Sequence, residues 1–231
     1  MGRFDTTRWS MVLRARGDPA DARVALEALC RTYRPPVLAF VRSHVRVRDS
    51  AEDLTQAFFT RFLERAWHAN ADPERGRFRT FLLTALKRFL IDAQVEARTL
   101  KRGGDVRFEA LDAADEGALG AVESPDDVFE REWARAVLTV ALGRLRLEAE
   151  QAGKLELFDR LSEFLVEAPD EADYAQVASD LGLRRNTLAV AVHRLRHRLR
   201  ELVRDELAET TAGAHDMGEE LRALRGALGA D

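Results

Sequence analysis

The 231-residue sequence predicts an all-α protein with two helical domains joined by a flexible linker. Three observations predict this fold class. Apolar residues recur at helical spacing along most of the chain, and β-type alternation of useful length is absent. The segment KRGGDVRFEALDAADEGALGAVESP has adjacent glycines, many acidic residues and no sustained period, as linkers do. The stretch YAQVASDLGLRRNTLAVAVHRLRHRLR has the pattern of a helix-turn-helix.

These patterns divide the chain into four predicted segments. They are a helical domain over 1–102, an acidic linker over 103–126, a helix-turn-helix domain over 127–206 and a C-terminal helical extension over 207–231.

The N-terminal domain contains start and stop signals for its first expected helices. Asp18-Pro19 places a proline at the first helical position, and Pro35-Pro36 predicts a break. Asp49 followed by Glu52 has the spacing of a capping box. A longer helix is expected from about Phe78 to Ala97, since apolar residues recur there at helical spacing.

The C-terminal half carries similar signals. Ser124-Pro125 followed by Asp127 predicts the start of a helix. A further helix is expected around Leu157, Leu161 and Leu165. Asp216 and Glu219 form a second capping-box pattern, at the start of the terminal extension.

The helix-turn-helix stretch also predicts its own register. Asp173 is the expected cap of its first helix, and Gly182 stands where the turn needs a positive φ. The buried stripe of the second helix is Leu188, Val192, Leu195 and Leu199. The residues left to face a DNA groove are Arg184, Arg185, Asn186, Thr187, Ala189, Val190, His193, Arg194 and Arg196. Arg198 is expected to hold phosphate. The alternative is a generic helical hairpin with a basic exterior.

The charge distribution favours a polyanionic partner although the net charge is −4. One basic block lies between Arg75 and Arg102 and a second between Arg184 and Arg204, and acidic residues outnumber basic ones from Asp105 to Glu132. Two basic patches joined by an acidic tether suggest two contacts with one nucleic acid. The alternative is that both patches are solvated helix faces.

Several classes of protein are disfavoured by composition. Cys30 is the only cysteine, which excludes a disulfide framework and a cysteine-rich zinc site. His193 and His197 lie four residues apart but have no third ligand nearby, so we expect neither metal nor cofactor. The sequence has no apolar run of about 20 residues and no signal-peptide core, which predicts a cytoplasmic protein without membrane insertion.

Two further stretches carry a family resemblance. The segment DSAEDLTQAFFTRFLE, followed by GRFRTFLLTALKRFLIDAQVEARTLKRGG, resembles the second conserved region of bacterial RNA polymerase sigma factors. With a helix-turn-helix further along, the chain is similar to two-domain sigma factors of the extracytoplasmic-function type over roughly Leu26 to Glu206. The resemblance implies a protein that binds core RNA polymerase, recognises −35 and −10 promoter elements and promotes DNA melting, without enzymatic activity.

The resemblance also implies roles by position. The helix that docks on the polymerase β′ clamp helices would present Asp53, Gln56, Thr60 and Leu63. The loop from His68 to Gly76 corresponds to the family's base-capturing loop. Residues for the −10 element would be Asn70, Arg77, Arg79, Lys87, Arg88, Arg98, Lys101 and Arg102. Expected partners are core polymerase, through the β′ clamp helices and the β flap, and promoter DNA; control by an anti-sigma protein stays open.

The sequence departs from the family pattern at three positions, and two other functions are considered. Arg184 stands where many relatives cap the recognition helix with Ser or Pro, and Ala189 and Val190 replace its usual polar residues, so the −35 sequence is left open. Phe78, Phe81 and Phe89 are either core residues or platforms for bases. One rival function is a helix-turn-helix regulator that does not act as a polymerase sigma subunit. The other is a helical enzyme, for which no catalytic motif was found.

Overall fold

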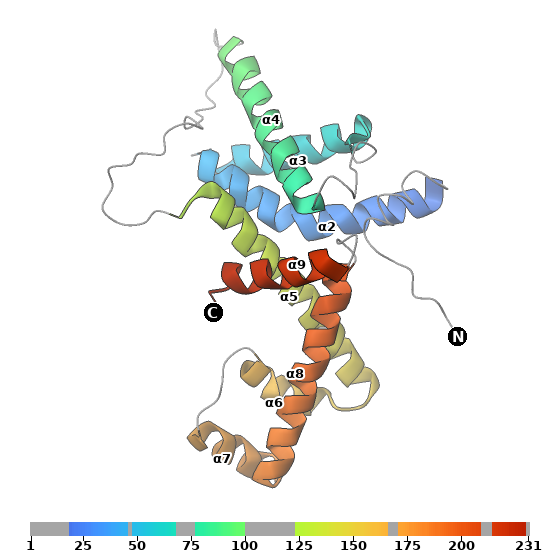
Figure 1. Cartoon of the computed structure of the whole chain (residues 1–231), viewed down its shortest axis with the longest axis vertical. Helices are drawn as coiled ribbons and strands as arrows, with labels where there is room; N and C mark the ends of the chain where they lie inside the picture. Colours follow the sequence, from blue (N-terminus) through green and yellow to red (C-terminus); the bar gives the residue numbers. More distant parts are fainter. Residues whose placement is uncertain are drawn as a thin grey trace. The chain divides into compact units, whose positions relative to one another are not determined.

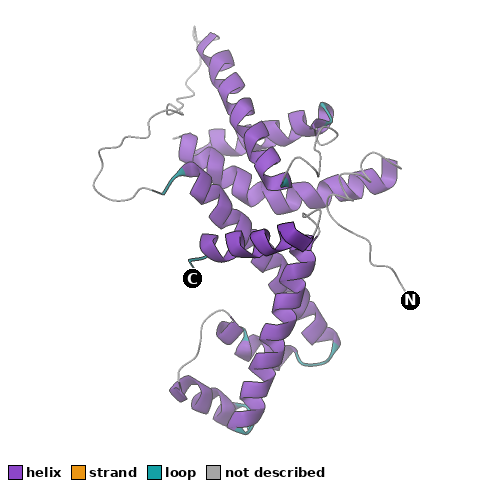
Figure 2. Ribbon diagram, viewed as in Figure 1, coloured by secondary structure: helices purple, strands orange, loops and turns teal. Residues whose placement is uncertain are grey.

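The computed structural model describes residues 19–45, 48–67, 77–99, 123–165, 171–208 and 214–229. These residues form helices and loops, and no β-strand occurs among them (Figure 2). The all-α fold class is therefore confirmed for the described part of the chain. The predicted linker, from 103 to 122, lies outside the described residues, as does the stretch before residue 19.

The chain divides into two compact units, and two helices contribute to both. Unit 1 comprises residues 1–136 and 207–231, and unit 2 comprises residues 137–206. The division into four segments, with bounds at residues 102, 126 and 206, stays a prediction.

Unit 1 is built on three helices: α2 (Pro19–His44), α3 (Arg48–Glu64) and α4 (Phe78–Thr99). The first two lie side by side (Figure 1). Unit 1 also contains the first half of α5 (Pro125–Gln151) and the C-terminal helix α9 (Ala214–Ala227). Its core is rich in aromatic side chains, and Phe40, Phe58, Phe62 and Phe129 are fully buried there. Phe129 packs edge-on against Phe40, so the start of α5 forms part of the core of unit 1.

Unit 2 contains the rest of α5, then α6 (Leu155–Leu161), the short 3-10 helix η3 (Glu163–Leu165), α7 (Glu171–Asp180) and most of α8 (Arg185–Ala208). The order of these helices along the chain follows the colours of Figure 1.

The structure confirms several sequence-predicted starts. Helix α2 begins at Pro19 and α5 at Pro125, each with proline at the first helical position. The Ser124 hydroxyl accepts a hydrogen bond from the Asp127 amide at 3.1 Å, and it donates to the Asp127 carboxylate at 2.6 Å. The Ser124 side chain therefore caps the start of α5, where the sequence predicted a helix to begin.

The break predicted at Pro35-Pro36 is wrong, because α2 continues through both prolines. Each proline removes one helical hydrogen bond and costs about 3 kcal/mol in a helix interior. The side chains around them lie on one packed face, where Tyr33, Val37 and Phe40 are 0–1% exposed. Burial of that face offsets the local cost, so tertiary packing decides the conformation.

Three predicted capping residues are also wrong, because Asp49, Asp173 and Asp216 each lie inside a helix. The acidic partners expected to close two of these caps form ion pairs instead. Glu52 accepts hydrogen bonds from two arginines of α2, and Glu219 accepts one from Arg77. The local pattern assigned Glu52 and Glu219 to helix capping, but their carboxylates bind arginines from other parts of the chain.

Candidate nucleic-acid interface

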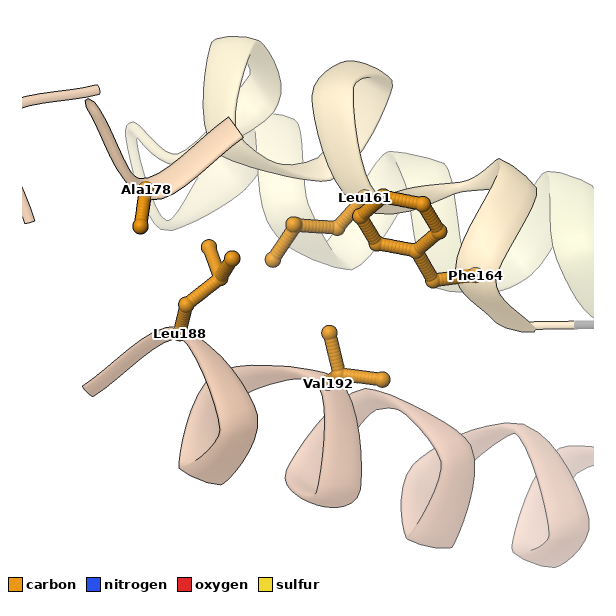
Figure 3. Close-up of a cluster of buried hydrophobic side chains, with 5 residues drawn as sticks. All are labelled: Leu161, Phe164, Ala178, Leu188 and Val192. Carbon is orange, nitrogen blue, oxygen red and sulfur yellow. The ribbon is translucent and has the colours of Figure 1, made fainter. Parts of the chain in front are cut away.

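The register of α8 is fixed by a small apolar core in unit 2. Leu188 and Val192 project from α8 toward Leu161 and Phe164, and Ala178 faces them from α7 (Figure 3). Val177, Leu181, Leu183 and Leu195 pack partly buried against this cluster. Three members of the predicted stripe, Leu188, Val192 and Leu199, are buried and Leu195 is half-buried. The predicted buried side of α8 is therefore confirmed.

The turn before α8 depends on a glycine. Gly182 has a φ of +63°, a conformation that a side chain disfavours, as the sequence predicted. The amide of Leu183 donates to the Ala178 carbonyl at 2.9 Å, which closes the end of α7. Arg184 precedes the first helical residue, and its carbonyl accepts from the amides of Thr187 and Leu188. The helix thus starts one turn before its first buried residue.

The candidate −35 residues lie on the side of α8 away from that core. The exposed members are Arg184, Arg185, Asn186, Thr187, Ala189, Val190, His193 and Arg194. Arg196 is the exception, because it is half-buried and its Nε donates to the Phe164 carbonyl at 2.8 Å. The structure therefore brings eight of the nine onto accessible surface, while Arg196 holds the end of η3.

A hollow of about 710 Å³ adjoins this surface. Four candidate −35 residues line one side of it, namely Asn186, Thr187, Val190 and Arg194. The opposite wall comes from α5, α6 and the turn between them and includes Leu145, Lys154, Leu157 and Phe158. Sequence reasoning missed this wall, since nothing local to α5 or α6 indicates that it faces α8.

Arg198 has partners within unit 2. Its Nε and Nη2 donate to the two carboxylate oxygens of Glu148 at 2.9 and 2.8 Å, and its Nη1 donates to Glu201 at 2.9 Å. These hydrogen bonds raise the pKa of Arg198 and lower the pKa of the Glu148 carboxyl. Arg198 therefore joins α8 to α5 within unit 2, instead of standing free for phosphate as expected.

The candidate polymerase-binding residues lie together on one exposed face of α3. Asp53, Gln56 and Thr60 line a hollow of about 470 Å³, together with Ala57, Arg61 and Glu64. Leu63 is 36% exposed, near the end of the same helix. The reverse side of α3 carries the fully buried Phe58 and Phe62. Helix α3 thus has one buried apolar side and one exposed polar side.

The candidate −10 residues of α4 differ sharply in accessibility. Arg88 is exposed, and no ion pair is found for it among the described residues. Lys87 donates to Asp126 at 2.7 Å, and Arg77 is half-buried. Arg79 is 4% exposed and so lies inside the protein. Only part of this set is on accessible surface in this structure.

Arg79 is surrounded by acidic and aromatic groups from other helices of unit 1. Its Nε contacts the Glu130 carboxylate at 3.0 Å, its Nη1 donates to Glu220, and its guanidinium carbon lies 4.0 Å from the centre of the Trp133 ring. Burial lowers the pKa of Arg79, and the charge of Glu130 opposes that effect. Arginine nevertheless stays charged in proteins, so this is a buried ion pair.

The remaining −10 candidates lie outside the described residues or side chains. Asn70, Lys101 and Arg102 lie outside the described residues, as does the loop from 68 to 76, and Arg98 lies in α4 without a described side chain. Phe78 and Phe89 are 2% exposed and pack among other aromatic rings, so they are core residues, whereas Phe81 is half-buried.

Sequence reasoning missed the acidic partners of these arginines. Glu130 is 51 residues from Arg79, and Glu220 is 141 residues away. No local spacing relates residues so far apart. The sequence gives one indication: Glu219 and Glu220 lie in the C-terminal extension, which the family resemblance does not cover.

Two other kinds of site are absent from the described residues. No helix among them is long and apolar enough to cross a bilayer. No group of three His, Cys, Asp or Glu side chains suited to a metal ion occurs in the described ranges.

Comparison with known proteins gives one match. Residues 29–102 match the family model of Sigma-70 region 2, which spans α3, α4 and most of α2. Searches of curated proteins and of solved structures found no match. Residues 29–102 are therefore similar to Sigma-70 region 2, and the match extends over less than half of the 231-residue chain.

Proposed function

We propose that this protein is a sigma factor of the extracytoplasmic-function type, which brings core RNA polymerase to −35 and −10 promoter elements. The observation that carries the proposal is the Sigma-70 region 2 match over residues 29–102. Within that segment, Asp53, Gln56 and Thr60 share one exposed hollow on α3, as a docking face requires. The second basic block, on α8, supports a further contact with DNA.

The α3 hollow is the proposed contact with the β′ clamp helices. Asp53, Gln56 and Thr60 offer a carboxylate, an amide and a hydroxyl, which can bind a basic or polar partner surface. Their removal should not disturb the core, because the apolar residues that anchor α3 lie on its other side.

The start of α8 is the proposed reader of the −35 element. A helix that enters the major groove presents its first turns to base edges, and that segment carries exposed Asn186, Thr187, His193 and Arg194. Arg194 can hold a guanine through two hydrogen bonds, and Val190 can meet a thymine methyl group. Contact with the β flap is a further expected role of unit 2.

The −10 element is the proposed ligand of the region around α4. Exposed Arg88 can contact phosphate, and the residues of 68–76 supply the loop that captures a base in the family. Such a factor needs no ATP to open DNA. It binds the separated strand more tightly than the duplex, so the open state becomes more populated.

The competing function is a helix-turn-helix regulator that acts beside an existing sigma subunit. It would account for α7 and α8 but leaves the region 2 match unexplained. Dimeric regulators read paired half-sites, so a two-fold symmetric footprint would favour it.

The test is transcription by purified components. The protein is added to sigma-free core polymerase with genomic DNA as template, and the transcripts are sequenced. A sigma factor yields transcripts that begin at a limited set of sites. Transcripts identical to those of core polymerase alone would remove the proposal.

A further inference from the structure

The start of α4 is held by carboxylates from the C-terminal helix. Arg77 donates through Nη2 to Glu219, and its Nε lies 3.2 Å from a Glu220 oxygen. Arg79 donates through Nη1 to the other Glu220 oxygen. Two neighbouring glutamates of α9 thus bind Arg79 of α4 and Arg77 just before it, and all four residues belong to unit 1.

Burial differs between the two ion pairs. The side chains of Arg79 and Glu220 are 5% and 2% exposed, whereas those of Arg77 and Glu219 are 29% and 37% exposed. A charge buried without any partner costs several kcal/mol, and Arg79 and Glu220 stabilise each other together with Glu130 and Arg77. Leu224, one turn after Glu220, is 7% exposed and adds an apolar contact to the docked helix.

The carboxylates of α9 and the phosphates of a nucleic acid suit the same guanidinium groups. Arginine presents a planar set of N–H donors that binds carboxylate and phosphate oxygens in similar geometry. Arg77 and Arg79 are candidate contacts for a DNA strand, and at present both bind carboxylates. A phosphate cannot reach Arg79 while Glu220 and the body of α9 cover it.

We propose that α9 is a built-in competitor for nucleic acid at Arg77 and Arg79, and that strand binding at the start of α4 requires α9 to leave its site. Glu219 and Glu220 then occupy, in the free protein, the positions that strand phosphates take in the complex. The identification of this nucleic acid as the −10 strand rests on the proposed function. With that identification, the C-terminal extension controls the access of DNA to the −10 surface.

The contacts of Arg77 and Arg79 determine how strongly α9 competes with nucleic acid. The half-exposed Arg77–Glu219 pair is weakened by salt, whereas the Arg79–Glu220 pair is shielded from it. Departure of α9 leaves Arg79 with Glu130 and the Trp133 ring, so its charge keeps one partner while it gains access to phosphate. The competitor therefore raises the DNA concentration needed for binding without destroying the binding surface.

The first test measures binding of a fluorescein-labelled single-stranded DNA oligonucleotide to the full chain by anisotropy, at fixed ionic strength. Glu219→Gln with Glu220→Gln should lower the Kd at least about fivefold, because the competitor loses both charges. The matched control is Glu150→Gln with Glu156→Gln, which makes the same change in net charge at two exposed positions of unit 2. The control should change the Kd less than about twofold. Equal effects of the two double variants would overturn the proposal, since net charge alone would then explain the gain.

The second test uses the wild-type chain and so does not depend on how a variant folds. Amide hydrogen exchange of residues 214–227 is measured with and without saturating oligonucleotide. Exchange should become at least about tenfold faster when the oligonucleotide is bound, because α9 has left its site. Unchanged protection of α9 in the complex would overturn the proposal.

Neither measurement uses polymerase or a promoter. A failure to initiate transcription would therefore remove the sigma function without deciding whether α9 competes with nucleic acid. A failure of the two tests above would remove the competition by α9 without deciding on the sigma function.

Discussion

Arg198 and Glu148 form a two-pronged ion pair that joins α8 to α5 within unit 2, with N–O distances of 2.9 and 2.8 Å. The same helix carries the proposed base-reading residues at its N-terminal end. Glu148 and Arg198 also line the hollow beside that surface. Their ion pair therefore holds the α5 side of the hollow next to the candidate −35 residues of α8.

This pair predicts a specific dependence of stability on pH. The hydrogen bonds from Arg198 lower the pKa of Glu148 in the folded protein. The pair therefore contributes fully above the unfolded pKa of about 4.3, and its contribution is lost as pH falls through the lower folded value. Because both side chains are more than 40% exposed, the contribution should stay below about 1 kcal/mol. Urea unfolding between pH 3 and pH 6 measures it.

The matched variants are Glu148→Gln and Glu156→Gln. The first should lose stability near neutral pH and show a weaker decline in acid, whereas the exposed Glu156 should behave like wild type. A Glu148→Gln protein with an unchanged acid profile would contradict the assigned role of the pair.

Arg79 and Arg88 should respond in opposite ways to truncation, although both are basic residues of α4. Arg79→Ala leaves the buried Glu220 carboxylate with Arg77 alone, and we expect a loss of about 1–3 kcal/mol in the free energy of unfolding. Arg88→Ala changes an exposed residue and should alter stability by about 0.5 kcal/mol at most, while weakening DNA binding. Denaturant unfolding and oligonucleotide binding of both variants separate the two roles. A stable Arg79→Ala protein would show that the ion pair is not structural.

The base-reading hypothesis predicts that Arg194 determines sequence preference. Arg194→Ala should flatten the preference at one or two −35 positions, which corresponds to about 1–3 kcal/mol against a wrong base. Arg200→Ala is the control, because Arg200 is exposed on another side of the helix and its Nε donates to the Arg196 carbonyl. Binding to a library of −35 sequences measures both. If Arg194→Ala weakens every sequence equally, the residue holds phosphate.

The docking face of α3 predicts a loss of polymerase affinity without loss of fold. Asp53→Ala with Gln56→Ala should weaken binding to core polymerase by at least about tenfold, or about 1.4 kcal/mol. Gln151→Ala with Asp205→Ala removes the same two residue types from exposed positions of unit 2 and should leave that affinity unchanged. Binding to immobilised core polymerase, with circular dichroism as the check on folding, decides the matter. Wild-type affinity in the first variant would remove α3 as the docking face.

Local signals in the sequence predicted the parts of the fold that depend on local physics. Gly182 marked a turn that needs positive φ, Ser124 marked a capped start, and Leu188 with Val192 marked the buried side of α8. Each depends on residues within about one or two helical turns, so a short window of sequence contains the cause.

The parts that could not be predicted depend on distant partners. The burial of Arg79 follows from Glu130, Trp133 and Glu220, none of which lies near it in sequence. The continuation of α2 through Pro35-Pro36 follows from packing of the face that includes Val37 and Phe40. Charge patterning alone therefore overstated how many basic residues of α4 face solvent.

Permanganate footprinting tests the central claim most directly, because it detects unpaired thymines. Duplex DNA from an initiation site found in the transcription assay is incubated with core polymerase, alone or with the protein, in the absence of nucleotides. We expect reactive thymines around the −10 element only when the protein and core polymerase are both present. A duplex that stays unreactive with both, while still bound in a two-fold symmetric footprint, would show a DNA-binding regulator and contradict the account.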